Sequence, residues 1–166
     1  MNRILIFLVV FFAVLASYFA CKLYFPLGEI TPEEEEEKIV VLAYFSNSEK
    51  SPEFLECTEV YPVKREVLKT PAVARAAVEE LLKGPTAEEK TQGYLTSINP
   101  SVKIQSLTIE GNTAKVDFDP QLEFQIGGSC RVAAIRAQIT QTLKQFPAVN
   151  EVIISIDGRT EDILQP

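Results

Sequence analysis

The sequence contains no histidine, no tryptophan and only three cysteines among its 166 residues. Without histidine, the chain lacks the commonest general base, the usual nitrogen ligand of transition metals and every catalytic triad that depends on imidazole. One of the three cysteines lies in or beside the apolar N-terminus, so too few thiols remain for a cysteine-based zinc site. We therefore expect no enzymatic activity, no catalytic residues, no structural metal and no cofactor.

An excess of positive charge is also absent. The chain carries 16 basic and 23 acidic residues, for a formal net charge of -7, and every acidic residue follows position 28. A surface of this sign repels nucleic acid and anionic lipid headgroups. We therefore expect no nucleic-acid partner.

An uncharged, apolar run extends from Ile4 to Ala20, with Arg3 before it and Lys22 after it. If the Lys22 side chain snorkels, the run reaches about twenty residues, enough to span a bilayer core of roughly 30 Å. The run predicts a membrane anchor over residues 1–27, formed by one uncleaved transmembrane helix. Because basic groups stay on the inner side, we expect the acidic remainder to be exported outside the cytoplasmic membrane.

Two kinds of processing are alternatives to an uncleaved anchor. Lipid attachment at Cys21 is one, although Tyr18 and Phe19 stand where small or aliphatic residues are normally found. Signal-peptide cleavage after Ala20 meets the same difficulty at Tyr18, whereas cleavage after Ala16 is tolerable.

Residues 28–38 form a predicted acidic linker. Five consecutive glutamates, Glu33 to Glu37, repel one another and bury nothing, which is typical of a solvated spacer. The folded domain is expected over residues 39–166, a length that supports a single hydrophobic core.

The first half of this domain predicts two strands and a helix. Val40 to Phe45 is short and apolar, which indicates a buried strand. Val60 to Leu68 also has strand spacing, but Pro62 cannot donate to a ladder, so we expect an edge strand or a strand with a break. A helix is predicted from a cap at Thr70 to a stop at Gly84. Its buried stripe consists of Ala74, Ala77, Val78, Leu81 and Leu82.

The second half predicts a hairpin, a second helix and a last strand. The hairpin arms, 102–109 and 113–118, contain apolar residues out of phase near Gln105, which indicates a bulge. The helix is capped by Ser129 and carries an apolar stripe. Three polar residues recur every seven positions on its opposite side: Arg131, Gln138 and Gln145. The last strand, 149–156, is apolar on both faces, which is typical of a central strand.

The predicted element order is strand-strand-helix-strand-strand-helix-strand. This order defines an α+β fold class, with a mixed β-sheet and two helices packed on one of its faces. One N-terminal transmembrane helix precedes the domain.

Several short motifs follow one another along this domain: Val63-Lys64-Arg65, Leu81-Leu82-Lys83-Gly84-Pro85, Val116-Asp117-Phe118 and Thr142-Leu143-Lys144-Gln145-Phe146-Pro147. In this order they resemble the GerMN domain, a family named for sporulation and spore germination, over residues 40–158. The chain carries a single copy of the pattern. The resemblance implies an anchored, extracytoplasmic envelope protein without catalytic residues, whose fold is similar to the small α/β modules of ring-shaped sporulation assemblies.

Asp117, Asp119 and Glu123 lie close in sequence at a predicted strand end and form a weak candidate for a cation site or for paired carboxylates. Alternation points Asp117 and Asp119 the same way, out of the core, so a solvated strand end is the better interpretation. Five arginines are expected to form ion pairs with the abundant carboxylates rather than to bind an anionic polymer. They are Arg65, Arg75, Arg131, Arg136 and Arg159.

Two functions from different classes remain. The first is a membrane-anchored module of envelope assembly or protein interaction, which self-associates or docks to an envelope protein. Its candidate partner-binding edge is the strand marked by Val60, Val63 and Arg65. The alternative is an envelope protein that binds a cell-wall or small-molecule ligand, which a closed, aromatic-lined cavity would favour. The chain supplies little for such a cavity, because its phenylalanines fall largely in the N-terminal run and on core stripes.

Cys57 and Cys130 are the candidate disulfide. Both lie in the part expected outside the cytoplasm, and they are the remaining pair once Cys21 is assigned to the anchor. Two unrelated buried thiols are the alternative interpretation, in which the helix N-terminus makes Cys130 somewhat acidic.

Overall fold

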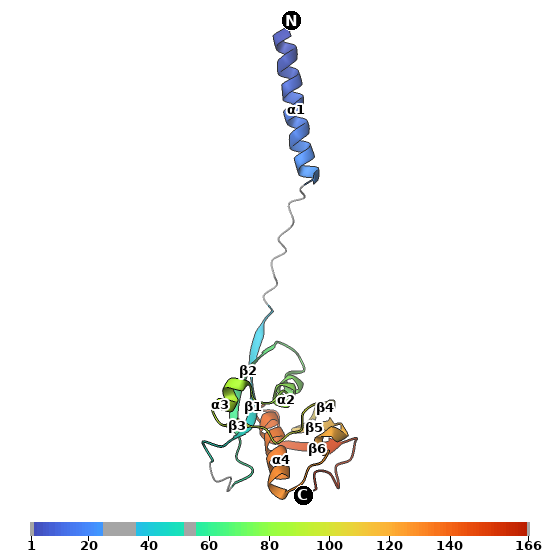
Figure 1. Cartoon of the computed structure of the whole chain (residues 1–166). Helices are drawn as coiled ribbons and strands as arrows, with labels where there is room; N and C mark the ends of the chain where they lie inside the picture. The colour runs from blue at the N-terminus through green and yellow to red at the C-terminus, as the bar shows by residue number, and fades with distance from the viewer. Residues whose placement is uncertain (1, 25–35, 52–55, 166) are drawn as a thin grey trace. The chain divides into compact units, whose positions relative to one another are not determined.

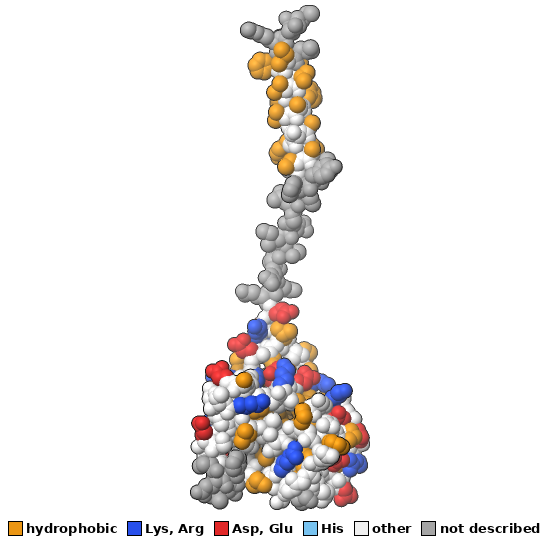
Figure 2. Space-filling view, viewed as in Figure 1, with side chains coloured by type: hydrophobic (Ala, Val, Ile, Leu, Met, Phe, Trp, Pro, Cys, Tyr) orange, Lys and Arg blue, Asp and Glu red, His pale blue; other side chains and the backbone are white. Residues whose placement is uncertain are grey.

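The computed structural model describes residues 2–24, 36–51 and 56–165, and the chain divides into two compact units, Met1–Glu35 and Glu36–Pro166. The first unit contains helix α1 (Asn2–Tyr24; Figure 1). Its side chains from position 6 to 21 are exposed, and most are apolar (Figure 2). In the part of the chain that the structure describes, no helix is long and apolar enough to cross a membrane. The predicted helix is therefore present, whereas the predicted membrane span is not found.

The acidic linker is described only at its end. Residues 28–35 lie outside the described residues. Glu37 belongs to the second unit, where its carbonyl accepts a hydrogen bond from the Lys69 N–H and its carboxylate pairs with the Lys69 ammonium group.

The first sheet of the second unit has the strand order β2-β1-β3. β1 (Lys38–Asn47) pairs antiparallel with β2 (Tyr61–Leu68) and, at its end, with the short β3 (Tyr94–Leu95). Alternate β1 side chains are buried, as a strand with one face on the core requires. β1 continues past the predicted end at Phe45 because Ser46 and Asn47 pair with β3. β2 lies at an edge, which confirms the prediction drawn from Pro62.

The second sheet has the order β4-β5-β6. β4 (Ile104–Glu110) and β5 (Thr113–Phe118) form the predicted hairpin, and the predicted bulge lies between Ile104 and Ser106. β6 (Glu151–Ile156) pairs parallel with β5. The prediction of a central last strand is wrong, because β6 is an edge strand. Its apolar side chains are buried against the core that α4 covers, and among the described residues no further strand pairs with it.

Helices α2 (Val73–Leu82) and α4 (Ser129–Lys144) contact each other and elements of both sheets. α4 contacts β1 and β6, and α2 contacts β1, β2 and β4 (Figure 1). The described residues thus form two three-stranded sheets that share one core with the helices, and the prediction of a single mixed sheet with both helices on one face is wrong. The α+β class itself holds, and the predicted stripe of α2 is buried, with Leu82 partly buried against the core.

Helix ends differ from the predicted caps. α2 begins at Val73, because the Thr70 hydroxyl accepts from the Ala72 N–H before the helix starts. α4 follows Gly128, whose φ of 91° is accessible to glycine, so Ser129 lies inside the helix and does not cap it. The polar segment after α2 forms a short helix, α3 (Ala87–Thr91), and a 3-10 turn, η1 (Pro120–Leu122), follows β5.

Candidate interaction edge

One edge of the first sheet is closed by side chains of α4. Gln145, just past the helix, accepts a hydrogen bond from the Leu42 N–H through Oε1 at 2.8 Å and donates from Nε2 to the Leu42 carbonyl at 2.7 Å. The Thr142 hydroxyl oxygen accepts from the Tyr44 N–H at 3.1 Å. These side chains supply three of the bonds that a neighbouring strand would otherwise supply, so these backbone groups of β1 are already satisfied.

The polar side of α4, opposite its apolar stripe, contacts protein at two of its three residues. Gln138 is fully buried, accepts from the Thr96 hydroxyl at 3.1 Å and donates to the Leu95 carbonyl at 3.4 Å. Gln145 binds β1 as described above. The reason is that α4 packs against β1 as well as β6, so these two amides meet backbone groups of the first sheet instead of water. Arg131, the third residue of that side, is exposed.

β2 forms the opposite edge of this sheet, and its backbone alternation follows from the same bonds. The β1 residues whose N–H groups turn toward α4 are even-numbered, so the odd-numbered residues of β1 turn toward β2. Ala43 pairs with Val63 in the observed register. The odd-numbered residues of β2 therefore bond to β1, and its even-numbered residues direct their N–H and carbonyl groups outward.

The outward positions are Pro62, Lys64, Glu66 and Leu68. Pro62 has no N–H, and at an outward position it removes no bond from the sheet. Among the described residues, no backbone group pairs with the N–H of Lys64, Glu66 or Leu68. The Lys64 carbonyl receives one long bond, 3.4 Å, from Arg65 Nη1. β2 thus presents a row of donors and acceptors of the kind to which another strand can be added.

Arg65 points inward and fastens β2 to the helices. Its guanidinium group forms a two-pronged hydrogen bond to Glu89 of α3, with Nη2 at 2.6 Å from Oε2, and lies 3.7 Å from Glu80 of α2. It also lies over the Phe45 ring, 5.9 Å from the centroid. The Arg65 side chain is only 12% exposed. The hydrogen bond to Glu89 raises the pKa of Arg65 and lowers the pKa of Glu89.

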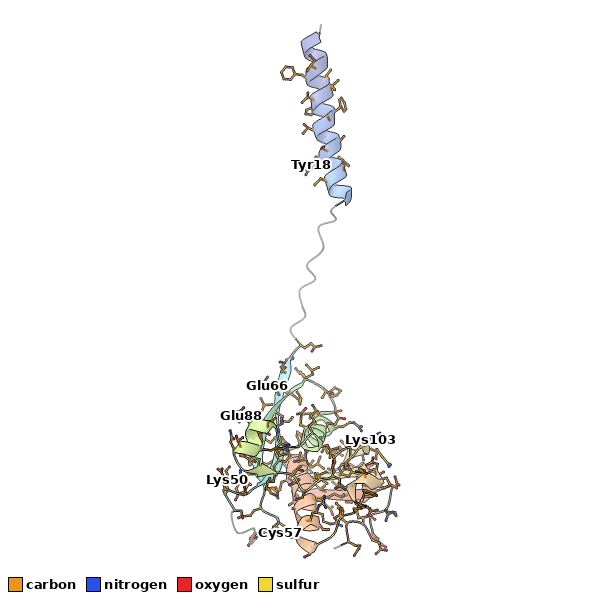
Figure 3. All side chains as sticks on the ribbon, viewed as in Figure 1. Tyr18, Lys50, Cys57, Glu66, Glu88 and Lys103 are labelled. Atoms are coloured by element: carbon orange, nitrogen blue, oxygen red, sulfur yellow. A yellow bond between two sulfur atoms is a disulfide. The ribbon has the colours of Figure 1, made fainter. Side chains whose placement is uncertain are left out.

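The residues named from the sequence are not those that direct backbone groups outward from β2. Val60 precedes β2, Val63 packs against the core, and Arg65 is held in ion pairs. The edge is carried by the alternate residues, whose side chains are exposed on the other face of the sheet. Lys64 and Glu66 (Figure 3) place opposite charges on that face, and the Leu68 side chain is 50% exposed. Pro62 was the signal that predicts this phase, because its missing donor is tolerated only at an outward position.

The edges of the second sheet are interrupted. β4 carries the bulge between Ile104 and Ser106, and the Ile104 carbonyl accepts from Arg75 Nη2 at 3.1 Å. At the end of β6, Ile156 exchanges hydrogen bonds with Arg159 of the following turn. Bulges and covering turns blunt a strand edge. β2 is therefore the better candidate for strand addition.

The weak carboxylate cluster is divided among separate partners. Asp117 accepts from the Ser155 hydroxyl at 2.5 Å, Asp119 accepts from the Lys103 N–H at 3.0 Å, and Glu123 pairs with Arg159. Over residues 2–24, 36–51 and 56–165, no group of three or more acidic or cysteine side chains is arranged to hold a metal ion. Of the five arginines predicted to form ion pairs, Arg65, Arg75 and Arg159 do so, whereas Arg131 and Arg136 donate to carbonyl groups.

The predicted disulfide between Cys57 and Cys130 is present, with a Cα–Cα distance of 5.1 Å. It fixes the loop before β2 to the start of α4 (Figure 3). A cleft of about 440 Å³ lies beside the bridge, and Asn47, Thr96 and Arg131 are among the residues that line it. No aromatic side chain among the described residues lines this cleft or the two next to α2.

The fold and its edges define a small α+β domain with one sheet edge closed by a helix and one left open. The family model Germane, described as "Sporulation and spore germination", matches residues 42–162. The chain therefore belongs to this family, as the resemblance to GerMN domains predicted.

Two solved structures from Bacillus subtilis share the fold. The tandem GerMN domains of the sporulation protein GerM align with a TM-score of 0.58 and 19% sequence identity, over 75% of this chain and 41% of that chain. The first GerMN domain of GerM aligns with a TM-score of 0.53 and 21% identity, over 74% of this chain and 85% of that chain. The chain thus spans about two fifths of the tandem structure. No curated protein sequence matches it.

Proposed function

We propose that this chain is a non-catalytic interaction module of the cell envelope that acts in sporulation or germination and binds its partner by strand addition at β2. The observation that carries the proposal is the contrast between the two edges of one sheet. Gln145 and Thr142 occupy the Leu42 N–H and carbonyl and the Tyr44 N–H of β1, while the outward N–H groups of β2 have no partner among the described residues. The family description supports the biological setting.

The β2 edge is suited to binding because it is both open and rigid. Arg65 ties the strand to α2 and α3, so an arriving strand meets groups already held in place. Backbone bonds to Lys64, Glu66 and Leu68 would supply affinity. The exposed charges at positions 64 and 66 would select the partner and its register.

We further propose that α1 attaches the domain to a membrane and that the rest of the chain is exported. The exposed apolar side chains of α1 support attachment, since water would otherwise surround them. The Cys57–Cys130 disulfide supports export, because such bridges persist in oxidising compartments. The chain is expected to remain with membranes after alkaline extraction and to be digested by protease added outside the cell. Release by alkali, or protection from the protease, would contradict the respective part.

Photo-crosslinking in intact cells tests the binding edge. A photoreactive residue at position 66 should trap a partner, whereas one at the exposed Thr108 of β4 should not. The Glu66→Pro variant removes one outward donor without taking a bond from β1, so it should fold and lose the partner. Glu66→Asp keeps both the donor and the negative charge and is the control. Crosslinks at position 108 instead, or undiminished binding by a folded Glu66→Pro variant, would refute strand addition at β2.

A further inference from the structure

We propose that β2 pairs with β2 of a second copy of this chain, antiparallel about a two-fold axis that passes Arg65. This inference rests on the proposed function, since it names the partner of the same edge. It follows from the order of residues along the strand, which is Pro62, Val63, Lys64, Arg65, Glu66, Val67 and Leu68. Around Arg65 the sequence is mirrored in chemical type. Lys64 is matched by Glu66, and Val63 by Val67. Apolar residues, Pro62 and Leu68, stand at the two ends.

The backbone phase permits this arrangement. Outward groups belong to the even-numbered residues, so hydrogen-bonded pairs must join even positions to even positions. With Arg65 on the axis, Lys64 lies opposite Glu66 of the second copy, and each such pair exchanges both of its backbone bonds. The Leu68 N–H reaches the carbonyl of Pro62, which needs no donor of its own to accept it. The proline therefore marks the end of the paired segment.

Charge selects this register over its neighbours. Moving the axis by one residue in either direction places Lys64 opposite Lys64 or Glu66 opposite Glu66, and like charges directly opposite each other destabilise a strand pair. In the proposed register the opposite charges alternate across the exposed face. On the inner face Val63 meets Val67 of the second copy.

Arg65, the residue on the axis, does not repel its copy in the second chain. Two copies of Arg65 face each other there, but each guanidinium group is turned inward and matched by Glu89 and Glu80 of its own chain. A partner of unrelated sequence would not need a mirrored strand, whereas an interface formed by the same patch on both subunits must be complementary to itself. The mirrored pattern of β2 therefore favours a second copy as the occupant.

Charge reversal in the full-length, oxidised chain tests the inference by sedimentation equilibrium in detergent. Wild type should dimerise, and Lys64→Glu and Glu66→Lys should each weaken dimerisation by on the order of tenfold, because each places like charges opposite one another. The double variant should dimerise as wild type does. An equimolar mixture of the two single variants should recover dimerisation as a heterodimer. Lys103→Glu is the charge control. Lys103 is exposed and lies just before β4 of the second sheet, so this variant should dimerise as wild type does.

Each other outcome overturns the inference. If wild type stays monomeric at every concentration, a second copy is not the partner of β2. If a crosslinked partner is nevertheless lost in Glu66→Pro, the proposed function still stands with a different partner. Single variants that dimerise like wild type place the contact elsewhere. Folded single variants whose mixture fails to associate show that the register is wrong. Circular dichroism of each variant establishes that it is folded.

Discussion

Replacing Gln145 by alanine tests whether α4 closes the edge of β1. The Gln145 amide takes part in three hydrogen bonds, two with the Leu42 backbone and one from Nε2 to the Thr142 carbonyl at 2.6 Å. Each such bond contributes about 1 kcal/mol net, and a buried group left without a partner costs about 1–3 kcal/mol. The site is partly buried, so water replaces some of the lost bonds. We expect the free energy of unfolding to fall by about 2–3 kcal/mol.

Thermal and denaturant unfolding measure this loss. For a domain of this size, 2–3 kcal/mol corresponds to a decrease in Tm of roughly 10 °C. Gln141→Ala is the matched control, because Gln141 is exposed on the same helix and makes no side-chain hydrogen bond among the described residues. It should stay within about 0.5 kcal/mol of wild type, as surface substitutions usually do.

A second variant separates hydrogen bonding from size. Gln145→Glu keeps the acceptor that Leu42 N–H uses but replaces the donor with a carboxylate oxygen, which then faces the carbonyl groups of Leu42 and Thr142. It should be at least as unstable as Gln145→Ala at pH 7 and should recover partly in acid, where the carboxyl group regains a proton. Equal stability of Gln145→Ala and Gln141→Ala would refute the idea that this amide closes the edge.

Two further predictions concern the ties that hold the domain together. Replacing Cys57 and Cys130 together by serine should lower the free energy of unfolding by roughly 4 kcal/mol in denaturant titrations, because the bridge closes a long loop between cysteines 73 residues apart. Reduced wild type should be as stable as the variant, and a loss below about 1 kcal/mol would contradict the expected value. The hydrogen bond from Arg65 holds the pKa of Glu89 below its ordinary value of 4.5, so the stabilisation from this pair is complete above pH 4.5 and is lost as the pH falls through the lowered pKa. Glu89→Gln should therefore be less stable than wild type at pH 7, and thermal melts should show the gap closing in acid; a gap that does not change with pH would refute the assignment.

Local patterns in the sequence were sufficient where burial on one side decides the structure. The stripe of α2, the second hairpin arm and the bulge in β4 depend on residues a few positions apart, and each was predicted in place. The edge position of β2 followed from one missing donor at Pro62. The disulfide followed from the small number of cysteines, because only one pair remained outside the apolar N-terminus.

The arrangement of strands into sheets could not be predicted in the same way. A run of alternating apolar residues shows that one face is buried, but the pattern is the same whether the strand joins one sheet or another. β1 and β5 both belong to the core, yet they lie in different sheets. The apolar content of β6 likewise records burial against the core, and it does not distinguish an edge strand from a central one.

The residues that form the candidate edge could not be predicted from the sequence, for a related reason. A glutamine at helical spacing opposite an apolar stripe predicts a solvated face, because its usual partner is water. Gln138 and Gln145 instead face backbone groups of the first sheet, which depends on where α4 packs and not on the helix itself. Once the Gln145 bonds to β1 are known, they determine which residues of β2 point outward.

The alternating charges of β2 also serve to limit unwanted pairing. Exposed charges on an edge strand generally discourage association, since an uncharged arriving strand would strip them of water and a charged one meets like charges unless its own order is complementary. The same charges permit association when the arriving strand carries them in mirrored order, as Lys64 and Glu66 do around Arg65. Protection and recognition are thus two consequences of one pattern. A variant with neutral residues at both positions 64 and 66 distinguishes them. If the charges only prevent unwanted pairing, this variant should associate more strongly than wild type. If the charges recognise a second copy, it should associate more weakly.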